Sequence, residues 1–268
     1  MKHLLINLFP SSKSIYYLWL LLNITMDTMD QSEKRKWRPL ERMFNEVPGR
    51  YDLLNRIITL RLDERWRKKA VRECLDGNPD SILDLCTGTG DLVLRMAANV
   101  NGETSVHALD YSEPMLKVAR KKADKKGLGK IEFVHGDAAD MPYETETHDA
   151  IGIGFAFRNL TYKNPDRDIF LGEIYRVLKT DGRFVIIESS QPSGKVLKVL
   201  FRFYLRVFVA GLGGMISGHM GAYRYLAASA RNFYTPDEVR KLLLSAGFKK
   251  VIHKSLSGGI AGLTVAIK

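Results

Sequence analysis

The sequence predicts an α/β protein that is built on a mostly parallel β-sheet. Short apolar runs alternate with helix-like segments between Ser81 and Ser190, which is the pattern of βαβ units. The first apolar run passes into a glycine turn, as expected where a strand of a parallel sheet leads into a helix. Two further apolar runs flank Gly258 and Gly259, and a hairpin there would add an antiparallel strand to the sheet.

The expected elements follow in chain order. Helical character runs over residues 38–75 and is interrupted at Pro48 and Gly49. Strands and helices then alternate up to Pro192, where an apolar and basic segment begins. The last helix carries a capping box at Thr235 and Glu238. The strands are expected at residues 81–86, 104–110, 130–137, 148–157 and 183–190, and the helices at residues 91–100, 113–127, 165–180, 222–233 and 236–246.

Residues 1–28 differ in character from the rest of the chain. Their apolar run, residues 15–24, is too short to span a bilayer, and no clear signal-peptide cleavage site follows it. Met26 and Met29 come just after the run, so we interpret this extension as a misassigned start, with a weak membrane anchor as the alternative. One domain is expected over residues 29–268, in which residues 192–234 form an inserted helical cover that faces the substrate and the membrane.

Composition narrows the class of partner. The 268 residues carry a formal net charge of +11, which suits nucleic acid, an anionic membrane or an acidic substrate. No nucleic-acid-binding signature occurs in the sequence, so we expect no nucleic-acid partner. Cys74 and Cys86 have neither metal-ligand nor redox spacing, which predicts no metal site and favours the cytoplasm.

The stretch LDLCTGTGDL, residues 83–92, is the first candidate for a binding site. A phosphate-binding loop needs a lysine after its last glycine, whereas Asp91 follows Gly90 here and would repel a phosphate. A dinucleotide fingerprint needs a third small residue where Val93 stands. An NAD-dependent oxidoreductase is therefore disfavoured, although it stays an alternative from another class of enzyme.

Acidic residues stand at the ends of successive predicted strands, namely Asp84, Asp110 and Asp137. Asp110 lies about twenty positions after Gly90, where a carboxylate can bind the hydroxyl groups of a ribose. An acidic crevice suits a nucleoside that carries a positive charge and no phosphate. S-adenosylmethionine, whose sulfonium is positive, has these properties.

Other stretches of the sequence are more specific than the glycine turn. They are MFNEVPGRYDLLNRIITL, GFAFRNLTYKNPD with IYRVLKTDGR, and AYRYLAAS before a final LSGGIAGL. With them, residues 42–268 resemble the ubiquinone/menaquinone biosynthesis C-methyltransferases, which are class I S-adenosylmethionine-dependent methyltransferases. The resemblance implies a Rossmann-like sheet of seven strands. It also implies methylation of a ring carbon of a polyprenylated quinol, namely demethylmenaquinol to menaquinol.

The resemblance also implies which residues bind the cofactor. The glycine turn would hold the methionine part through Thr89, and Asp110 would bind the ribose. Asp137 and the amide of Ala138 would bind the adenine, while Gly154 offers only its backbone. The full set expected on this basis is Asp84, Thr87, Gly88, Thr89, Gly90, Asp110, Tyr111, Asp137, Ala138 and Gly154.

Methylation of carbon requires an electron-rich ring, which a quinol becomes when a hydroxyl group loses its proton. Arg158 directly follows the fourth strand, where it would stabilise the phenolate. His219 would take the proton, and Tyr223 in the pocket wall completes the catalytic set. The residues expected to contact the quinol are Tyr51, Asn55, Asn159, Arg224 and Tyr225.

Residues 195–211 explain part of the net charge. Wound as a helix, they place Lys195, Lys198, Arg202 and Arg206 on one stripe, with apolar residues around the remainder. Such a helix suits an anionic membrane surface, although a core-packed helix with one solvated face is the alternative. We therefore expect a cytoplasmic protein that contacts the inner face of the membrane, and we also consider a homodimer.

Alternatives within the resemblance stay open. A benzoquinol of the ubiquinone pathway offers the same ring-edge chemistry as a naphthoquinol, and another small-molecule acceptor is compatible with the cofactor site. A membrane-associated ligand-binding protein without catalytic activity is the remaining alternative.

Overall fold

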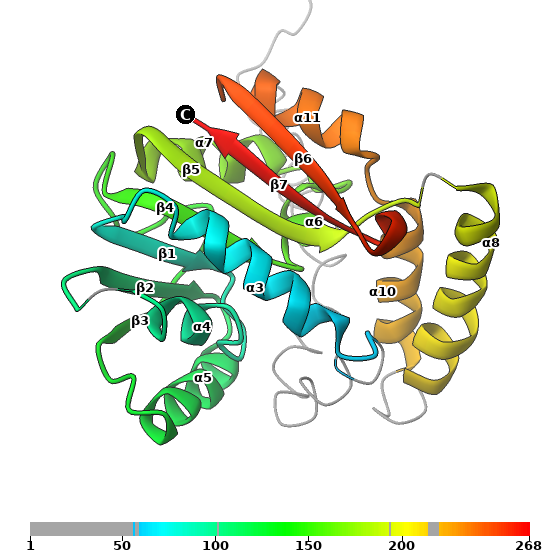
Figure 1. Cartoon of the computed structure of the whole chain (residues 1–268), viewed down its shortest axis with the longest axis horizontal. Helices are drawn as coiled ribbons and strands as arrows, with labels where there is room; N and C mark the ends of the chain where they lie inside the picture. The colour runs from blue at the N-terminus through cyan, green and yellow to red at the C-terminus, as the bar shows by residue number, and fades with distance from the viewer. Residues whose placement is uncertain (1–55, 57–58, 101, 193, 214–219) are drawn as a thin grey trace, which may run out of the picture. The chain divides into compact units, whose positions relative to one another are not determined.

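Seven strands form one sheet in the order β3-β2-β1-β4-β5-β7-β6 (Figure 1). Neighbouring strands from β3 to β5 are parallel, and β7 lies antiparallel between β5 and β6. The predicted sheet, with its antiparallel C-terminal hairpin, is therefore confirmed. The strands are β1 (Ser81–Leu85), β2 (Ser105–Asp110), β3 (Ile131–His135), β4 (His148–Gly154), β5 (Leu178–Ser189), β6 (Lys250–Leu256) and β7 (Ala261–Ile267).

The computed structural model describes residues 56, 59–100, 102–192, 194–213 and 220–268, all of which belong to a unit that spans residues 43–268. The predictions for the N-terminal extension, Tyr51, Asn55 and His219 lie outside the described residues. Tyr223 and Tyr225 belong to a described helix, but their side chains are not described.

Helices cover both faces of the sheet. Trp66 of α3 and Met96 of α4 belong to the core on one face, and α5 also contributes to it. Phe157 of α6, Ile174 of α7 and Leu243 of α11 pack on the opposite face. Because both faces are covered, β1 and β4 are buried at nearly every position rather than at alternate positions. The helix bounds are α3 (Leu62–Cys74), α4 (Val93–Ala97), α5 (Glu113–Lys125), α6 (Phe157–Thr161), α7 (Arg167–Val177) and α11 (Pro236–Ser245).

The capping box predicted for the last helix is present in α11. The hydroxyl of Thr235 accepts a hydrogen bond from the amide of Glu238 at 3.3 Å. In return, the Glu238 carboxylate accepts from the amide of Thr235 at 2.7 Å. The local sequence therefore fixes the start of this helix, which lies beside β6.

The helical insertion has an apolar core of its own. It contains α8 (Lys195–Tyr204), a π-helix η1 (Leu205–Gly213) and α10 (Met220–Asn232). Phe201, Leu205 and Val209 pack with Ala227 and Ala230 of α10. The prediction of one regular helix over residues 195–211 is wrong from Leu205 onward. In a regular α-helix, positions four residues apart do not lie exactly above one another, so Val209 would be rotated away from the face formed by Phe201 and Leu205. The wider turn of η1 returns Val209 to the face that contacts α10.

Two predicted boundaries around β4 and β5 are also wrong. β4 ends at Gly154 rather than at Phe157, because Phe155 adopts a left-handed conformation with φ of 61° and turns the chain into α6. β5 begins at Leu178, where the sequence predicted a helix up to an Asp-Gly turn. The pairing of β5 with β4 is interrupted by a register shift, and Asp181 beside it has φ of 61°, so the turn residues form an irregularity within the strand.

Candidate active site

The glycine turn follows β1 at the carboxyl edge of the parallel strands. Gly88 and Gly90 have φ of 55° and 85°, values that favour glycine. A Cβ atom on Gly90 would lie 3.0 Å from that of Ala119, so this glycine permits close packing against α5. A Cβ on Gly88 would meet nothing within 4 Å. The backbone at Gly88 is therefore open to a ligand.

Asp84 lies beneath this turn and is only 1% exposed. One of its carboxylate oxygens, Oδ2, accepts hydrogen bonds from the hydroxyl of Thr87 at 2.6 Å and from the amide of Val93 at 2.9 Å. Burial is the main reason why the pKa of Asp84 is raised to about 7. Its described contacts are thus within the protein, where they fix the turn and the start of α4.

Asp110 ends β2 and reaches the same turn. Its Oδ2 accepts a hydrogen bond from the amide of Gly88 at 2.7 Å, and its Oδ1 accepts from the amide of Ser112 at 2.8 Å. Burial raises the pKa of this carboxyl above its ordinary range, while the two amide donors oppose the rise. A carboxylate oxygen can accept more than one hydrogen bond, so Asp110 retains acceptor capacity toward a ribose.

Cys86 directly follows β1 and was not among the predicted site residues. The pKa of its thiol is raised well above the ordinary value, first by burial and then by the charges of Asp110, Asp84 and Asp137. The charges of all three predicted acids therefore act on the thiol of Cys86. In the sequence, only its position directly after the first strand and before the glycine turn indicated that Cys86 lies at this edge of the sheet.

Asp137 and Tyr111 complete the rim of this edge. Oδ1 of Asp137 accepts a hydrogen bond from the amide of Ala139 at 2.9 Å, and Ala138 between them is buried. The side chain of Tyr111 is 58% exposed, and its ring centroid lies 6.3 Å from that of His135. An exposed aromatic ring beside a carboxylate can stack on a planar base while the carboxylate accepts from an amino group.

Thr89 and Gly154 occupy two further predicted positions. Thr89 is buried within the glycine turn, and Gly154 is the last residue of β4, where it pairs with Ile187 of β5. Because β4 is the neighbour of β1 in the sheet, Gly154 and the glycine turn lie at the same edge. The chain leaves β4 at Phe155 and enters α6 there.

α6 presents the predicted acceptor residues Arg158 and Asn159. The guanidinium of Arg158 is buried and forms an ion pair with Glu188 of β5, at 2.8 Å from Nη1 to Oε1. Nη1 also lies 3.3 Å from the hydroxyl of Ser189. Among the residues that the structure describes, Nε of Arg158 and Oδ1 of Asn159 are buried without a hydrogen-bond partner. Buried polar atoms are rarely left unpaired, and these two lie on α6, just after the carboxyl end of β4.

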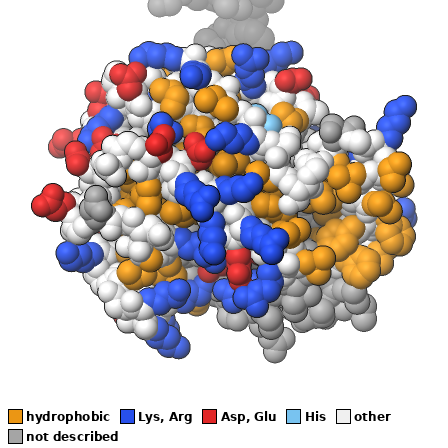
Figure 2. All heavy atoms as spheres, in the orientation of Figure 1, with side chains coloured by type: hydrophobic (Ala, Val, Ile, Leu, Met, Phe, Trp, Pro, Cys, Tyr) orange, Lys and Arg blue, Asp and Glu red, His pale blue; other side chains and the backbone are white. Residues whose placement is uncertain are grey.

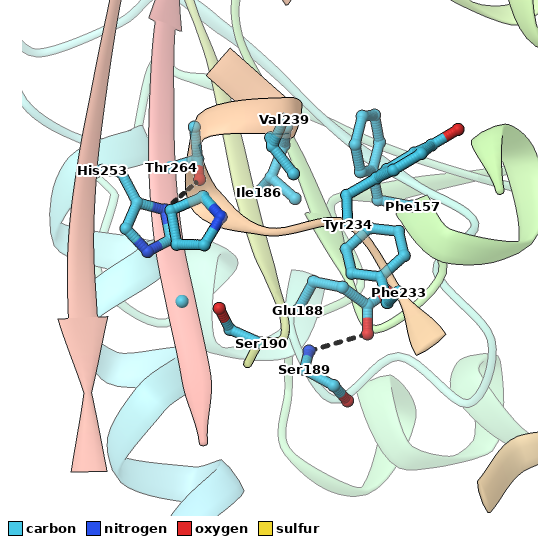
Figure 3. A pocket seen from close by; sticks show the side chains of 12 residues that line it. Phe157, Ile186, Glu188, Ser189, Ser190, Phe233, Tyr234, Val239, His253 and Thr264 are labelled. Carbon is cyan, nitrogen blue, oxygen red and sulfur yellow. Dashed lines mark hydrogen bonds between the residues drawn. The ribbon is translucent and has the colours of Figure 1, made fainter. Parts of the chain in front are cut away.

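Glu188 was not predicted as a site residue. Figure 3 shows it at the end of β5, in a pocket that is also lined by Phe157, Phe233 and Tyr234. The signal in the sequence was a carboxylate near the end of a predicted strand, as for Asp84 and Asp110. Of the remaining predicted residues with described side chains, Arg224 is exposed on α10.

The seven-stranded sheet, with its antiparallel C-terminal strands and its covering helices, is the fold of the class I methyltransferases. A SAM dependent methyltransferase from Aquifex aeolicus has the same fold, with a TM-score of 0.53 and 20% identity over 75% of this chain and 88% of that chain.

Comparison of the sequence with known families narrows the class further than the fold does. Residues 28–268 match the model of the ubiE/COQ5 methyltransferase family, to which the chain belongs. The chain is 41% identical to the demethylmenaquinone methyltransferase of Thermus thermophilus, over 83% of this chain and 98% of the relative. It is 35% identical to the ubiquinone/menaquinone biosynthesis C-methyltransferase UbiE of Citrifermentans bemidjiense, over 87% and 97%. The resemblance in the sequence is thereby confirmed.

Proposed function

We propose that this protein methylates a ring carbon of a polyprenylated quinol, converting demethylmenaquinol to menaquinol with S-adenosyl-L-methionine as the cofactor. The observation that carries this function is the family match over residues 28–268, together with relatives named demethylmenaquinone methyltransferase that align over nearly their whole length. The enzyme therefore acts in menaquinone biosynthesis.

The edge of the sheet fits this cofactor. Asp84, Asp110 and Asp137 all act electrostatically on Cys86, and such a group of carboxylates favours a cationic nucleoside over a phosphorylated one. The open backbone at Gly88 provides space for the methionine part. We assign the ribose to Asp110, stacking on the adenine to Tyr111, and the methionine to Thr87–Gly90. Asp137 and Ala138 would bind the edge of the adenine, with Gly154 beside the sulfur.

Arg158 and Asn159 are the proposed contacts of the quinol hydroxyl group. When bound, the cofactor supplies an electrophilic methyl group. Oδ1 of Asn159 would accept a hydrogen bond from the hydroxyl group, and Nε of Arg158 would donate to its oxygen as negative charge develops there. His219 is proposed to take the proton. Tyr223 and Tyr225, with Tyr51, Asn55 and Arg224, would enclose the ring.

Two measurements test this function. Calorimetry should detect S-adenosylhomocysteine binding without NAD binding, because the acidic edge disfavours the pyrophosphate. Purified protein should then transfer a labelled methyl group from S-adenosylmethionine to demethylmenaquinol. Binding of NAD in place of S-adenosylhomocysteine would contradict the cofactor assignment. Binding without any transfer to a quinol would leave a ligand-binding protein and contradict the activity.

The acceptor carries a polyprenyl tail, and we propose that α8 and η1 contact an anionic membrane surface to reach it. Exposed apolar side chains form a patch on these helices, visible on the right of Figure 2: Val196, Val199, Leu200, Phe203, Val207 and Phe208. Lys195, Arg202 and Arg206 are exposed on the same two helices. Apolar side chains that enter the head-group region beside cations that bind lipid phosphates are typical of an interfacial helix.

The described helices do not include one that is long and apolar enough to cross a bilayer. We propose a peripheral contact, which should depend on charge. Replacing Lys198, Arg202 and Arg206 with glutamate should abolish co-sedimentation with vesicles that contain anionic lipid. The same triple change at the exposed Lys117, Lys121 and Lys125 of α5 is the matched control and should have a much smaller effect.

A second copy of the chain is the other partner that could cover this patch. Analytical ultracentrifugation distinguishes the two. A monomer that binds anionic vesicles supports the membrane contact. A dimer that is disrupted by Phe203→Ser, with no vesicle binding by the wild type, would replace the membrane contact with a homodimer.

A further inference from the structure

Glu188 binds both the side chain and the backbone of Arg158. Its Oε1 accepts a hydrogen bond from Nη1 of Arg158 at 2.8 Å, and its Oε2 accepts from the Arg158 amide at 3.1 Å. Oε1 also accepts from the amide of Ser189 at 2.8 Å, which fixes the carboxylate against its own strand. Both side chains of the ion pair are buried, at 6% and 4% exposure.

The hydrogen bond from the Arg158 amide to Glu188 takes the place of a side-chain N-cap for α6. α6 starts after Phe155, and its N-cap residue Ala156 has no side-chain oxygen for the amides of the first turn. Oε2 of Glu188 accepts from one of these amides, that of Arg158. The start of α6 is thereby tied to the end of β5, and the same contact fixes the position of Asn159.

The side-chain contact leaves one edge of the guanidinium for a ligand. Nη1 of Arg158 is directed to Glu188 and Ser189, whereas Nε has no partner within the described parts of the chain. A guanidinium is planar, so fixing Nη1 also fixes the direction of the Nε edge. Glu188 lines a pocket together with the rings of Phe157, Phe233 and Tyr234 (Figure 3). Both side chains of the ion pair are buried, and the low local dielectric strengthens their interaction.

We infer that Glu188 is a positioning residue of the methyl transfer, which holds the Nε edge of Arg158 against the quinol oxygen next to the carbon that is methylated. This inference rests on the role proposed for Arg158. Glu188 itself contacts Arg158 and the backbone, and its effect on the reaction passes through Arg158.

Glu188→Gln removes the negative charge and keeps the shape of the side chain. A misplaced Arg158 should lower kcat by on the order of 10- to 100-fold, because small errors in position are costly at a reacting group. The KM for demethylmenaquinol and the Kd for S-adenosylhomocysteine should stay within about twofold of the wild type, since uniform binding is unaffected. Glu188→Asp, which keeps the charge but shortens the reach, should also lower kcat while preserving the fold.

Asp149→Asn is the matched control for loss of a structural carboxylate. Asp149 pairs with Lys179 at 2.8 Å and accepts from the amides of Asp80 and Ser81, so it resembles Glu188 in its contacts. Asp149 is the second residue of β4, whereas the candidate site lies at the carboxyl end of that strand. Asp149→Asn should lower the unfolding temperature and leave kcat unchanged.

A double-mutant cycle with Arg158→Gln separates the two proposals. If Glu188 acts through Arg158, Glu188→Gln should have no further effect on kcat once Arg158 is replaced. The positioning role alone would be overturned if the losses in kcat were additive. It would also be overturned if both Glu188 variants had a wild-type kcat while Arg158→Gln was impaired. A wild-type kcat in Arg158→Gln would instead overturn the role of Arg158 on which this inference rests.

Discussion

The two halves of the candidate site differ in how their polar groups are satisfied. In the cofactor half, formed by β1 to β3 and their turns, Asp84 and Asp110 accept hydrogen bonds from groups of the protein itself. In the acceptor half, formed by β4, β5 and α6, Nε of Arg158 and Oδ1 of Asn159 are buried without a described partner. The first half is preorganised by its own contacts, whereas the second leaves these two polar atoms for the proposed quinol.

The largest effect is expected for Arg158→Ala in the acceptor half. Loss of the group that stabilises the phenolate should lower kcat by about 10²- to 10³-fold. Because Glu188 would remain buried without its cation, the free energy of unfolding should also fall by roughly 3–5 kcal/mol. Methyl-transfer assays at a temperature where the variant is folded measure the first, and denaturant unfolding measures the second.

Cofactor binding by Arg158→Ala is the control for this prediction. Calorimetry should give an S-adenosylhomocysteine affinity close to that of the wild type, because the cofactor half is intact. A large loss of cofactor affinity in Arg158→Ala would show that the two halves are not separate, and the comparison would fail.

The next largest effect is expected for Asp110→Asn in the cofactor half. The Gly88 amide and the ribose would both lose a charged acceptor, so the Kd for S-adenosylhomocysteine should rise by about 10- to 100-fold. Asp124→Asn on the exposed side of α5 is the control and should not change the Kd. Unchanged affinity in Asp110→Asn would remove this residue from the cofactor site.

A smaller effect is expected from the titration of Asp84, which should make the free energy of unfolding depend on pH. Its pKa is raised from the ordinary 3.8 to about 7 in the folded protein, mainly by burial. Between these two pH values, the native state keeps a proton that the unfolded chain has released. The free energy of unfolding should therefore fall as pH rises through this window and level off above about pH 7, by a few kcal/mol in order of magnitude.

Asp84→Asn isolates this contribution. Denaturant unfolding of the wild type and the variant between about pH 4 and pH 8 gives the difference in their free energies of unfolding. The wild type should lose stability relative to the variant as pH rises. A constant difference across the window would mean that Asp84 is not titrating in it.

The smallest effect is expected at Thr235, which lies in neither half of the site. Thr235→Ala removes the capping box of α11 and should lower the free energy of unfolding by about 1 kcal/mol. Neither kcat nor cofactor affinity should change, so the variant calibrates how much activity a purely structural loss removes. A fall in kcat comparable to that of Glu188→Gln would weaken the specific role given to the acceptor half.

The same comparison explains what the sequence could and could not predict. The cofactor half is encoded locally, because each acid directly ends or follows a strand and the glycines lie in one short turn. The mostly parallel sheet and the shared edge of Asp84, Asp110 and Asp137 therefore followed from the alternation of strands and helices. The apolar runs also predicted which segments are buried on both faces.

The acceptor half depends on contacts between distant segments. The pairing of Glu188 with Arg158 joins residues thirty positions apart, and neither local pattern predicts it. The left-handed conformation of Phe155 was also missed, because non-glycine residues rarely adopt it and no turn residue marks the position. The change from α8 to η1 has no sequence signal of its own, because it follows from packing against α10.

The most direct test of the proposed function is the position of the transferred methyl group. Purified protein is incubated with ¹³C-methyl-labelled S-adenosylmethionine and, in parallel, with demethylmenaquinol and the corresponding demethyl benzoquinol, and the products are examined by NMR. The expected result is a methyl group bound to a ring carbon, formed with demethylmenaquinol and strongly reduced in Arg158→Gln. A methyl ether on a quinol oxygen, or labelled product from neither acceptor, would contradict the proposed reaction.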